Sequence, residues 1–67
     1  MTQIELYNRV RVTSSRFEDM GVTPGTQGYV IEKYDDGNFE IEVSNPETGE
    51  TVALFAATPE DVELDEG

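Results

Sequence analysis

The chain has 67 residues and contains no cysteine, no histidine and no tryptophan. A chain of this length makes one small domain, and we expect a single domain over residues 1–67. Without cysteine it can form neither a disulfide nor a thiolate metal site, and without histidine it lacks the commonest catalytic base and zinc ligand. We therefore expect no catalytic residues, no metal and no other cofactor.

Fifteen acidic and four basic residues give the chain a formal net charge of -11. Binding to a nucleic-acid backbone or an anionic membrane requires clustered lysine and arginine, so this charge argues against direct contact with either. It is compatible with a basic protein partner, and also with an acidic surface that serves only solubility. No apolar run is long enough to span a membrane, and the first residues do not have the pattern of a signal peptide, so we expect a cytoplasmic location.

The first expected strand covers residues 7–13. There Val10 and Val12 alternate with two arginines, which is the period of a strand with one buried face. We expect the arginines to lie beside a strand that carries outward glutamates, such as the one with Glu40 and Glu42.

A long connection follows over residues 14–24. Phe17 and Met20 are three positions apart, which favours one helical turn that Gly21 would end. Two interpretations of Phe17 stay open: an apolar anchor for a partner, or a side chain that covers the end of the core. After the next turn, Gly28 enters a strand at a position where a side chain does not fit.

The clearest pattern is a β-hairpin over residues 28–43. Phe39, Ile41 and Val43 alternate with glutamates, and Asp35-Asp36-Gly37 is typical of a hairpin turn in which the glycine has a positive φ. We expect the three apolar side chains to be buried and the glutamates between them to lie in solvent.

The register of this hairpin stays open. A two-residue loop pairs Tyr34 with Phe39 and Lys33 with Glu40. A three-residue loop with Gly37 in a bulge instead pairs Ile31 with Ile41 and Glu32 with Glu40. A bend that lets the first strand contribute to two sheets would reconcile the two patterns.

The rest of the chain predicts short elements. A polar turn over residues 45–49 precedes a strand over 50–57. Thr58-Pro59-Glu60-Asp61 is typical of a helix start, and we expect one 3₁₀ turn there. A short strand over 62–64 follows, and residues 65–67 are expected to be a frayed acidic tail.

This order of elements predicts an all-β fold: a small five-stranded SH3-like barrel with a long first loop and a 3₁₀ turn before the last strand. A small OB barrel fits less well, because it usually carries a helix between its third and fourth strands. Only residues 44–49 are available for that helix.

Four segments together resemble a bacterial domain-of-unknown-function family of short, acidic, stand-alone SH3-like proteins: Tyr7–Val12, Pro24–Gly28, Tyr34–Gly37 and Phe39–Val43. The resemblance covers nearly the whole chain and implies an SH3-like barrel. Some members resemble antitoxin or immunity proteins, which would imply that the chain neutralises a toxin. The turn with Gly25 and Gly28 is also similar to one in SH3-like barrels of ribosomal and nitrile-hydratase-type subunits.

The acidic hairpin turn does not predict a calcium site. Placing Gly37 at the glycine of an EF-hand loop puts Tyr34 and Val43 at ligand positions. The glutamates near the turn do not predict acid–base chemistry either, because a catalytic carboxyl would need burial and a raised pKa.

The candidate functional surface is acidic and combines the hairpin with the long loop. Its charge would steer a basic partner. We expect a non-enzymatic protein-binding module, first of all an immunity or antitoxin protein that neutralises a basic toxin such as a nuclease. The alternatives are an accessory or regulatory subunit of a bacterial enzyme complex, or a homo-oligomer that shields an open sheet edge. The candidate partner-binding residues are Phe17, Glu18, Asp19, Met20, Glu32, Asp35, Asp36, Glu40 and Glu42.

Overall fold

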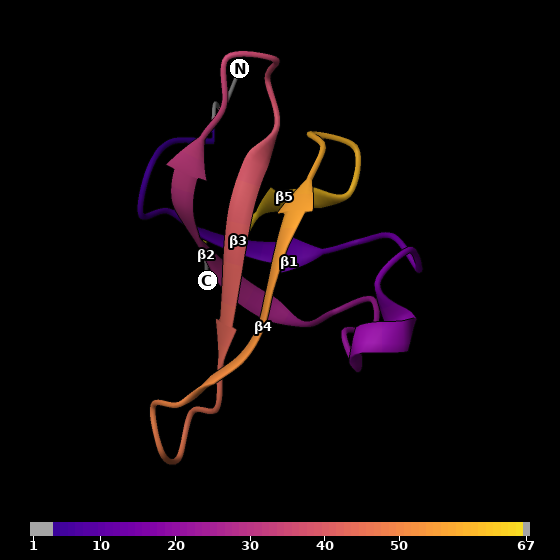
Figure 1. Ribbon diagram of the computed structural model, residues 1–67, viewed down its shortest axis with the longest axis vertical. Coiled ribbons are helices and arrows are strands. Elements are labelled where there is room, and N and C mark those ends of the chain that lie inside the picture. The colour runs from indigo at the N-terminus through magenta and orange to yellow at the C-terminus, as the bar shows by residue number, and fades with distance from the viewer. Residues whose placement is uncertain (1–3, 67) are drawn as a thin grey trace.

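The computed structural model describes residues 4–66, which form an all-β domain with five antiparallel strands in one sheet. This confirms the all-β class and the five strands that the sequence predicts. Residues 1–3 and 67 of the predicted domain lie outside the described residues. The strands are β1 (Arg9–Val12), β2 (Gln27–Lys33), β3 (Phe39–Ser44), β4 (Thr51–Ala57) and β5 (Val62–Leu64) (Figure 1).

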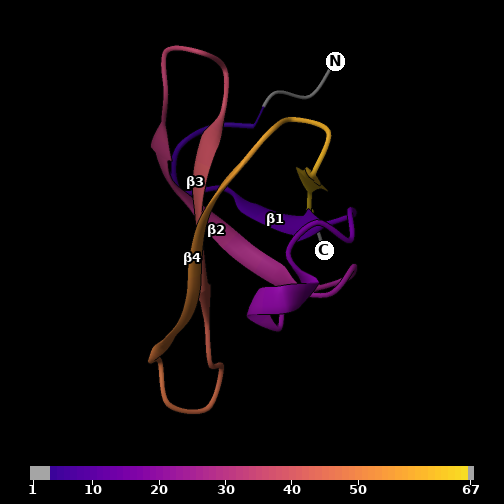
Figure 2. The ribbon, with the colours of Figure 1, turned by 45° about the vertical axis from the view of Figure 1, so that its right-hand side comes forward.

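The strand order in the sheet is β4-β3-β2-β1-β5. The three middle elements of the chain, β2, β3 and β4, form a meander, and β5 returns to pair with β1, with Val10 opposite Leu64. The sheet is bent, so that β1 and β5 lie to one side of the β3–β4 ribbon (Figure 2). The sheet does not close on itself, since β4 and β5 are its two edges. Among the described residues, the sheet is thus not closed into the small barrel that the sequence predicts.

The tip of the β2–β3 hairpin has a three-residue loop. The Tyr34 amide donates to the Asn38 carbonyl (2.9 Å), the Gly37 amide donates to the Tyr34 carbonyl (3.0 Å), and Gly37 has a φ of 91°. Glu32 lies opposite Glu40, as the three-residue alternative requires. The two-residue loop is therefore wrong.

A β-bulge at Ile31 changes the register further along β2. Val30, and not Ile31, lies opposite Ile41. The three-residue alternative is thus wrong beyond the bulge. An extra residue bends a strand and increases its twist, and here it lets Val30 enter the core while β2 pairs with both β1 and β3.

The core lies on one face of the bent sheet. Alternate residues of β1, β3 and β4 contribute to it, which follows from the period of two along each strand. The buried apolar residues are Val10, Val12, Phe17, Val22, Val30, Phe39, Ile41, Val43, Ala53, Phe55, Ala57 and Val62.

The only described helical turn lies in the long first loop. The 3₁₀ helix η1 (Glu18–Met20) ends at Gly21, which has a φ of 81°. Between β4 and β5, where a 3₁₀ turn was expected, Thr58 and Asp61 form a hydrogen-bonded turn instead. The Asp61 carboxylate accepts from the Thr58 amide (2.9 Å) and hydroxyl (3.0 Å), which fixes this single turn without continuing it as a helix.

Candidate functional site: the outer face of the sheet

The sheet face that points away from the core is called the outer face here. Its side chains come from the positions of β1 to β4 that alternate with the core residues. One row crosses all four strands, because Arg9 lies opposite Tyr29, Tyr29 opposite Glu42, and Glu42 opposite Leu54. The outer face therefore places a cation, an aromatic ring, a carboxylate and an aliphatic side chain next to one another.

Glutamates dominate the part of the outer face over β2 and β3. Glu32 and Glu40 lie directly opposite each other, an arrangement that is destabilising for like charges. The neighbouring Lys33 does not neutralise them, since its ammonium pairs with Glu5 (3.0 Å). None of the ion pairs among residues 4–66 involves Glu32, Glu40 or Glu42.

Glu40 and Glu42 are more closely held than the sequence predicts. Both are half-buried. Glu40 accepts a hydrogen bond from the Tyr34 hydroxyl (2.9 Å), which, together with the nearby carboxylates, raises the pKa of Tyr34. Glu42 accepts from the Thr51 hydroxyl (2.7 Å). Their carboxylates are thus oriented by neighbours rather than free in solvent.

Exposed apolar side chains lie beside these acids. Tyr29 in β2 and Val52 and Leu54 in β4 are each about half exposed, at 46%, 56% and 50%. Leu54 is the cross-strand neighbour of Glu42. Exposed apolar side chains interspersed with charged ones are compatible with a protein-binding surface.

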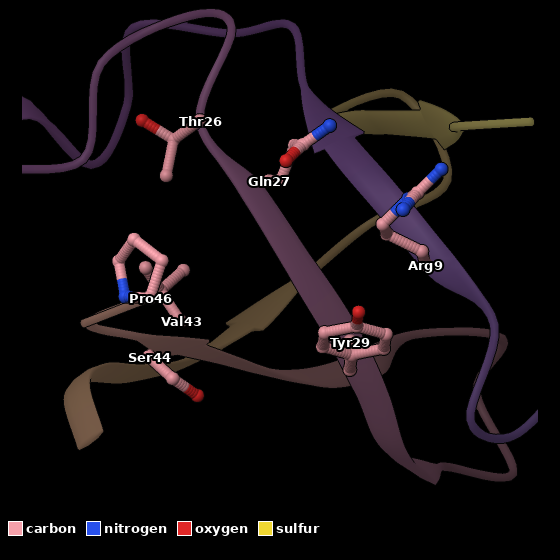
Figure 3. A pocket seen from close by; sticks show the side chains of 7 residues that line it. All are labelled: Arg9, Thr26, Gln27, Tyr29, Val43, Ser44 and Pro46. Atoms are coloured by element: carbon pink, nitrogen blue, oxygen red, sulfur yellow. The ribbon is translucent and has the colours of Figure 1, made fainter. Parts of the chain in front are cut away.

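A pocket of about 420 Å³ is lined by residues of β1, β2 and the end of β3. Tyr29, Gln27 and Arg9 lie on one side of it, and Val43, Ser44 and Pro46 lie on the other (Figure 3). This size lies at the low end for ligand pockets. Thr26 completes the lining.

A charged cluster joins β1 to the end of the chain. The Asp65 side chain is only 2% exposed, and its carboxylate lies 3.7 Å from Arg9 Nε and 3.8 Å from an Arg11 guanidinium nitrogen. Gln27 donates to the same carboxylate (2.6 Å), and Arg11 also pairs with Glu63. The expectation of a frayed tail is wrong for Asp65.

The partner of the β1 arginines also differs from the one expected. They pair with Glu63 in β5 and with Asp65 just after it, because β1 lies between β2 and β5 and is not a neighbour of β3 in the sheet. The alternation Val62-Glu63-Leu64-Asp65 continues one residue past β5 and could have indicated this.

The long loop lies on the other side of the sheet from the acidic part of the outer face. Phe17 is 7% exposed, and its ring stacks against Phe55 of the core (centroids 4.3 Å apart). The structure thus supports the interpretation of Phe17 as a core side chain. Glu18, Asp19 and Met20 are exposed in η1, beyond Phe17 on the core side.

The predicted site residues therefore form separate groups. The structure brings Glu32, Glu40 and Glu42 together on the outer face. Asp35 and Asp36 are exposed at the hairpin tip, where the Asp36 carboxylate accepts from the Asn38 amide (3.0 Å). What the sequence missed are the aliphatic residues of β4, since nothing local shows which face of this apolar strand is buried.

Residues 4–66 contain neither a metal-binding cluster nor a membrane-spanning helix. No three histidine, cysteine or acidic side chains are grouped as a metal ion would require. No helix in this range is long and apolar enough to cross a membrane.

Comparison with curated proteins and with solved structures gives no match. One protein family, described as "Domain of unknown function (DUF4926)", matches residues 6–64. This range includes all five strands and the whole outer face described above. The chain therefore belongs to this domain-of-unknown-function family.

Proposed function

We propose that the chain is a non-enzymatic protein-binding module whose outer face binds a basic protein. One observation carries the proposal: Glu32 and Glu40 face each other without a neutralising cation, beside Glu42 and the exposed Tyr29 and Leu54. A cationic group of a partner would remove the repulsion between the two glutamates. Relief of this repulsion would add to the free energy of binding.

The partner class follows from the charge of the chain. With a net charge of -11, the chain attracts basic surfaces and repels nucleic acid and anionic membranes. A toxin that acts on nucleic acid has such a basic surface, so we propose an immunity or antitoxin protein in the bacterial cytoplasm. The SH3-like architecture belongs to this proposal, supported by the five strands, the long first loop and the short connections between the later strands.

An accessory subunit of an enzyme complex is the second candidate. The surface pocket beside Tyr29 favours it, because a preformed recess can take up anchoring side chains of a docked partner. Affinity capture with the tagged chain separates the candidates. An immunity protein should retain one small basic protein and inhibit it, whereas an accessory subunit should retain a multi-subunit enzyme.

The outer face is tested by charge removal and binding kinetics on the captured, purified partner. Glutamine keeps the hydrogen-bond acceptors that Tyr34 and Thr51 use, so the triple change Glu32→Gln, Glu40→Gln and Glu42→Gln should leave the fold intact. We expect the association rate at low salt to fall roughly tenfold, because electrostatic steering acts on association.

The matched control removes three exposed charges elsewhere: Glu47→Gln, Glu60→Gln and Glu66→Gln. This variant has the same net charge and should lose less than about threefold in association rate. Equal effects of the two variants would show that net charge alone matters and that the outer face is not the binding surface.

A further inference from the structure

The two edges of the sheet differ in length and charge. Strand β5 has three residues and carries Glu63, which pairs with Arg11. Strand β4 has seven residues, Thr51–Ala57, and none of them is charged. Short and charged edges resist pairing with other chains, whereas a long uncharged edge is a template for it. Only β4 has the properties of a pairing edge.

No strand of the described chain pairs with the free side of β4, and the regular part of the strand is Ala53–Ala57, because a shift in register against β3 leaves Val52 as an extra residue. Its only neighbouring strand is β3. Leu54 projects from it on the outer face, and both Leu54 and Val52 are half exposed or more. The chain has fifteen acidic residues, yet all seven residues of β4 are uncharged. An added strand would pair along this uncharged edge.

The acids of β3 lie close behind this edge. Glu40 is the cross-strand neighbour of Ala56, and Glu42 is the neighbour of Leu54. Strands in a sheet are about 4.8 Å apart, so a strand added to β4 would lie about 10 Å from β3. The alanine side chain at position 56 is a single methyl group, over which a long lysine or arginine side chain of the added strand can reach the Glu40 carboxylate.

We propose that β4 pairs with an extended segment of the basic partner, which adds a sixth strand to the sheet. This rests on the proposed function and specifies how the partner is held. The segment alternates basic side chains, which lie over Ala56 towards Glu40, with apolar side chains, which face the core side of β4. Main-chain hydrogen bonds supply affinity, and Glu40 and Glu42 supply selectivity for basic segments.

A second copy of this chain fits the edge less well. Two copies would each bring a net charge of -11. The β4 strand of a second copy has no basic side chain that could reach Glu40. Charge complementarity therefore favours the basic partner over self-association.

The test uses a capped synthetic peptide of the length of β4, with lysine and valine alternating, added to the isotope-labelled chain. NMR should show cross-strand nuclear Overhauser effects between the peptide and β4, and slower amide exchange in β4. A peptide of the same sequence with alternate backbone nitrogens methylated keeps the charge but cannot pair, and it should bind at least tenfold more weakly.

Two lysine variants locate the contact on the protein. Leu54→Lys puts a charge at the edge, and Met20→Lys puts the same charge at an exposed position of η1, on the other side of the sheet. We expect Leu54→Lys to weaken peptide binding at least tenfold and Met20→Lys less than threefold. Val52→Lys serves as a second edge variant if Leu54→Lys does not fold.

Three results would overturn the inference. Equal binding of the methylated peptide would show that charge alone attracts the peptide. Cross-strand effects between two β4 strands in the protein alone would show that a second copy occupies the edge. A captured partner that binds Leu54→Lys and Val52→Lys as it binds the wild type would show that the edge is not used, while the proposed function would stand. Failure to retain any basic partner would refute the proposed function, and the peptide titration would still decide whether β4 is a pairing edge.

Discussion

Two glycines in the β2–β3 hairpin are required for different physical reasons. Gly28 has an ordinary strand conformation, but a Cβ atom there would lie 2.9 Å from both the Glu42 carbonyl oxygen and Ile41 Cγ2. Gly37 has open space around it, but its φ of 91° strains any residue with a side chain. One glycine is needed for space and the other for backbone conformation.

Substitution by alanine and by asparagine separates these two causes. Gly28→Ala should lower the free energy of unfolding by about 1–3 kcal/mol through overpacking. Gly37→Ala should lower it by about 1–2 kcal/mol through backbone strain. Asparagine adopts a positive φ more readily, so Gly37→Asn should recover much of that loss, whereas Gly28→Asn should cost at least as much as Gly28→Ala. Urea unfolding of the four variants measures this, and a neutral Gly28→Ala would mean that the hairpin ladder is looser than described.

Some roles of individual residues could be predicted from the sequence and others could not. Gly28 and Gly37 could be predicted because turn and strand signals are local. The alternation past β5 could have placed Asp65 on the same side as Glu63, but not its burial, which depends on Arg9 and Arg11 at the far end of the sequence. For Phe17 the sequence left two interpretations, and only the position of Phe55 decides between them.

The turn between β4 and β5 is held by one buried carboxylate. Burial of the Asp61 carboxyl by itself opposes ionisation. Hydrogen bonds from the Thr58 amide and the hydroxyls of Ser14 and Thr58, with the Arg16 guanidinium 2.6 Å away, outweigh this and lower the pKa of Asp61. The turn, the long loop and β5 are joined at this side chain.

Asp61 should make the stability of the chain depend on pH. Because its pKa is lower in the folded state, its contribution is present above the ordinary aspartate pKa of about 3.9 and disappears as the pH falls through the folded value. Asp61→Asn should therefore reduce the free energy of unfolding at pH 7 by about 1.5–3 kcal/mol, and the difference from the wild type should shrink as the pH falls below about 4. Urea unfolding across this pH range measures it.

The neighbouring Glu60 provides the control. Its side chain is exposed, so Glu60→Gln should change stability little at either pH. A difference between wild type and Asp61→Asn that stays constant from pH 7 to pH 2 would contradict the charge-dependent role of Asp61.

At the scale of elements, the five strands could be predicted and the register of β2 could not. Val30 and Ile31 are both apolar, so the sequence does not show which of them enters the core. The choice depends on β1, which pairs with the other half of β2. The bulge at Ile31 lets β2 pair with β3 on one side and with β1 on the other. No local sequence pattern predicts its position.

The whole molecule distributes its charge unevenly. All four basic side chains are used in ion pairs with Glu5, Asp61, Glu63 or Asp65. The sequence predicts the sign of the net charge, but only the three-dimensional pairing shows that the glutamates of β2 and β3 are left without cations. The sequence also predicts that the acidic loop and the acidic hairpin form one surface, whereas in the structure the sheet separates them.

The pairing of β1 with β5 has a consequence for folding kinetics. The meander connects neighbouring strands through short loops, whereas contact between Val10 and Leu64 closes a loop of nearly the whole chain. Because the entropy cost of closure grows with loop length, we expect β2, β3 and β4 to be ordered in the folding transition state before β5 docks. Chevron analysis should give φ-values near zero for Val62→Ala and roughly 0.5 or more for Ile41→Val. High φ-values at Val62 would instead show that joining the two ends of the chain starts the folding reaction.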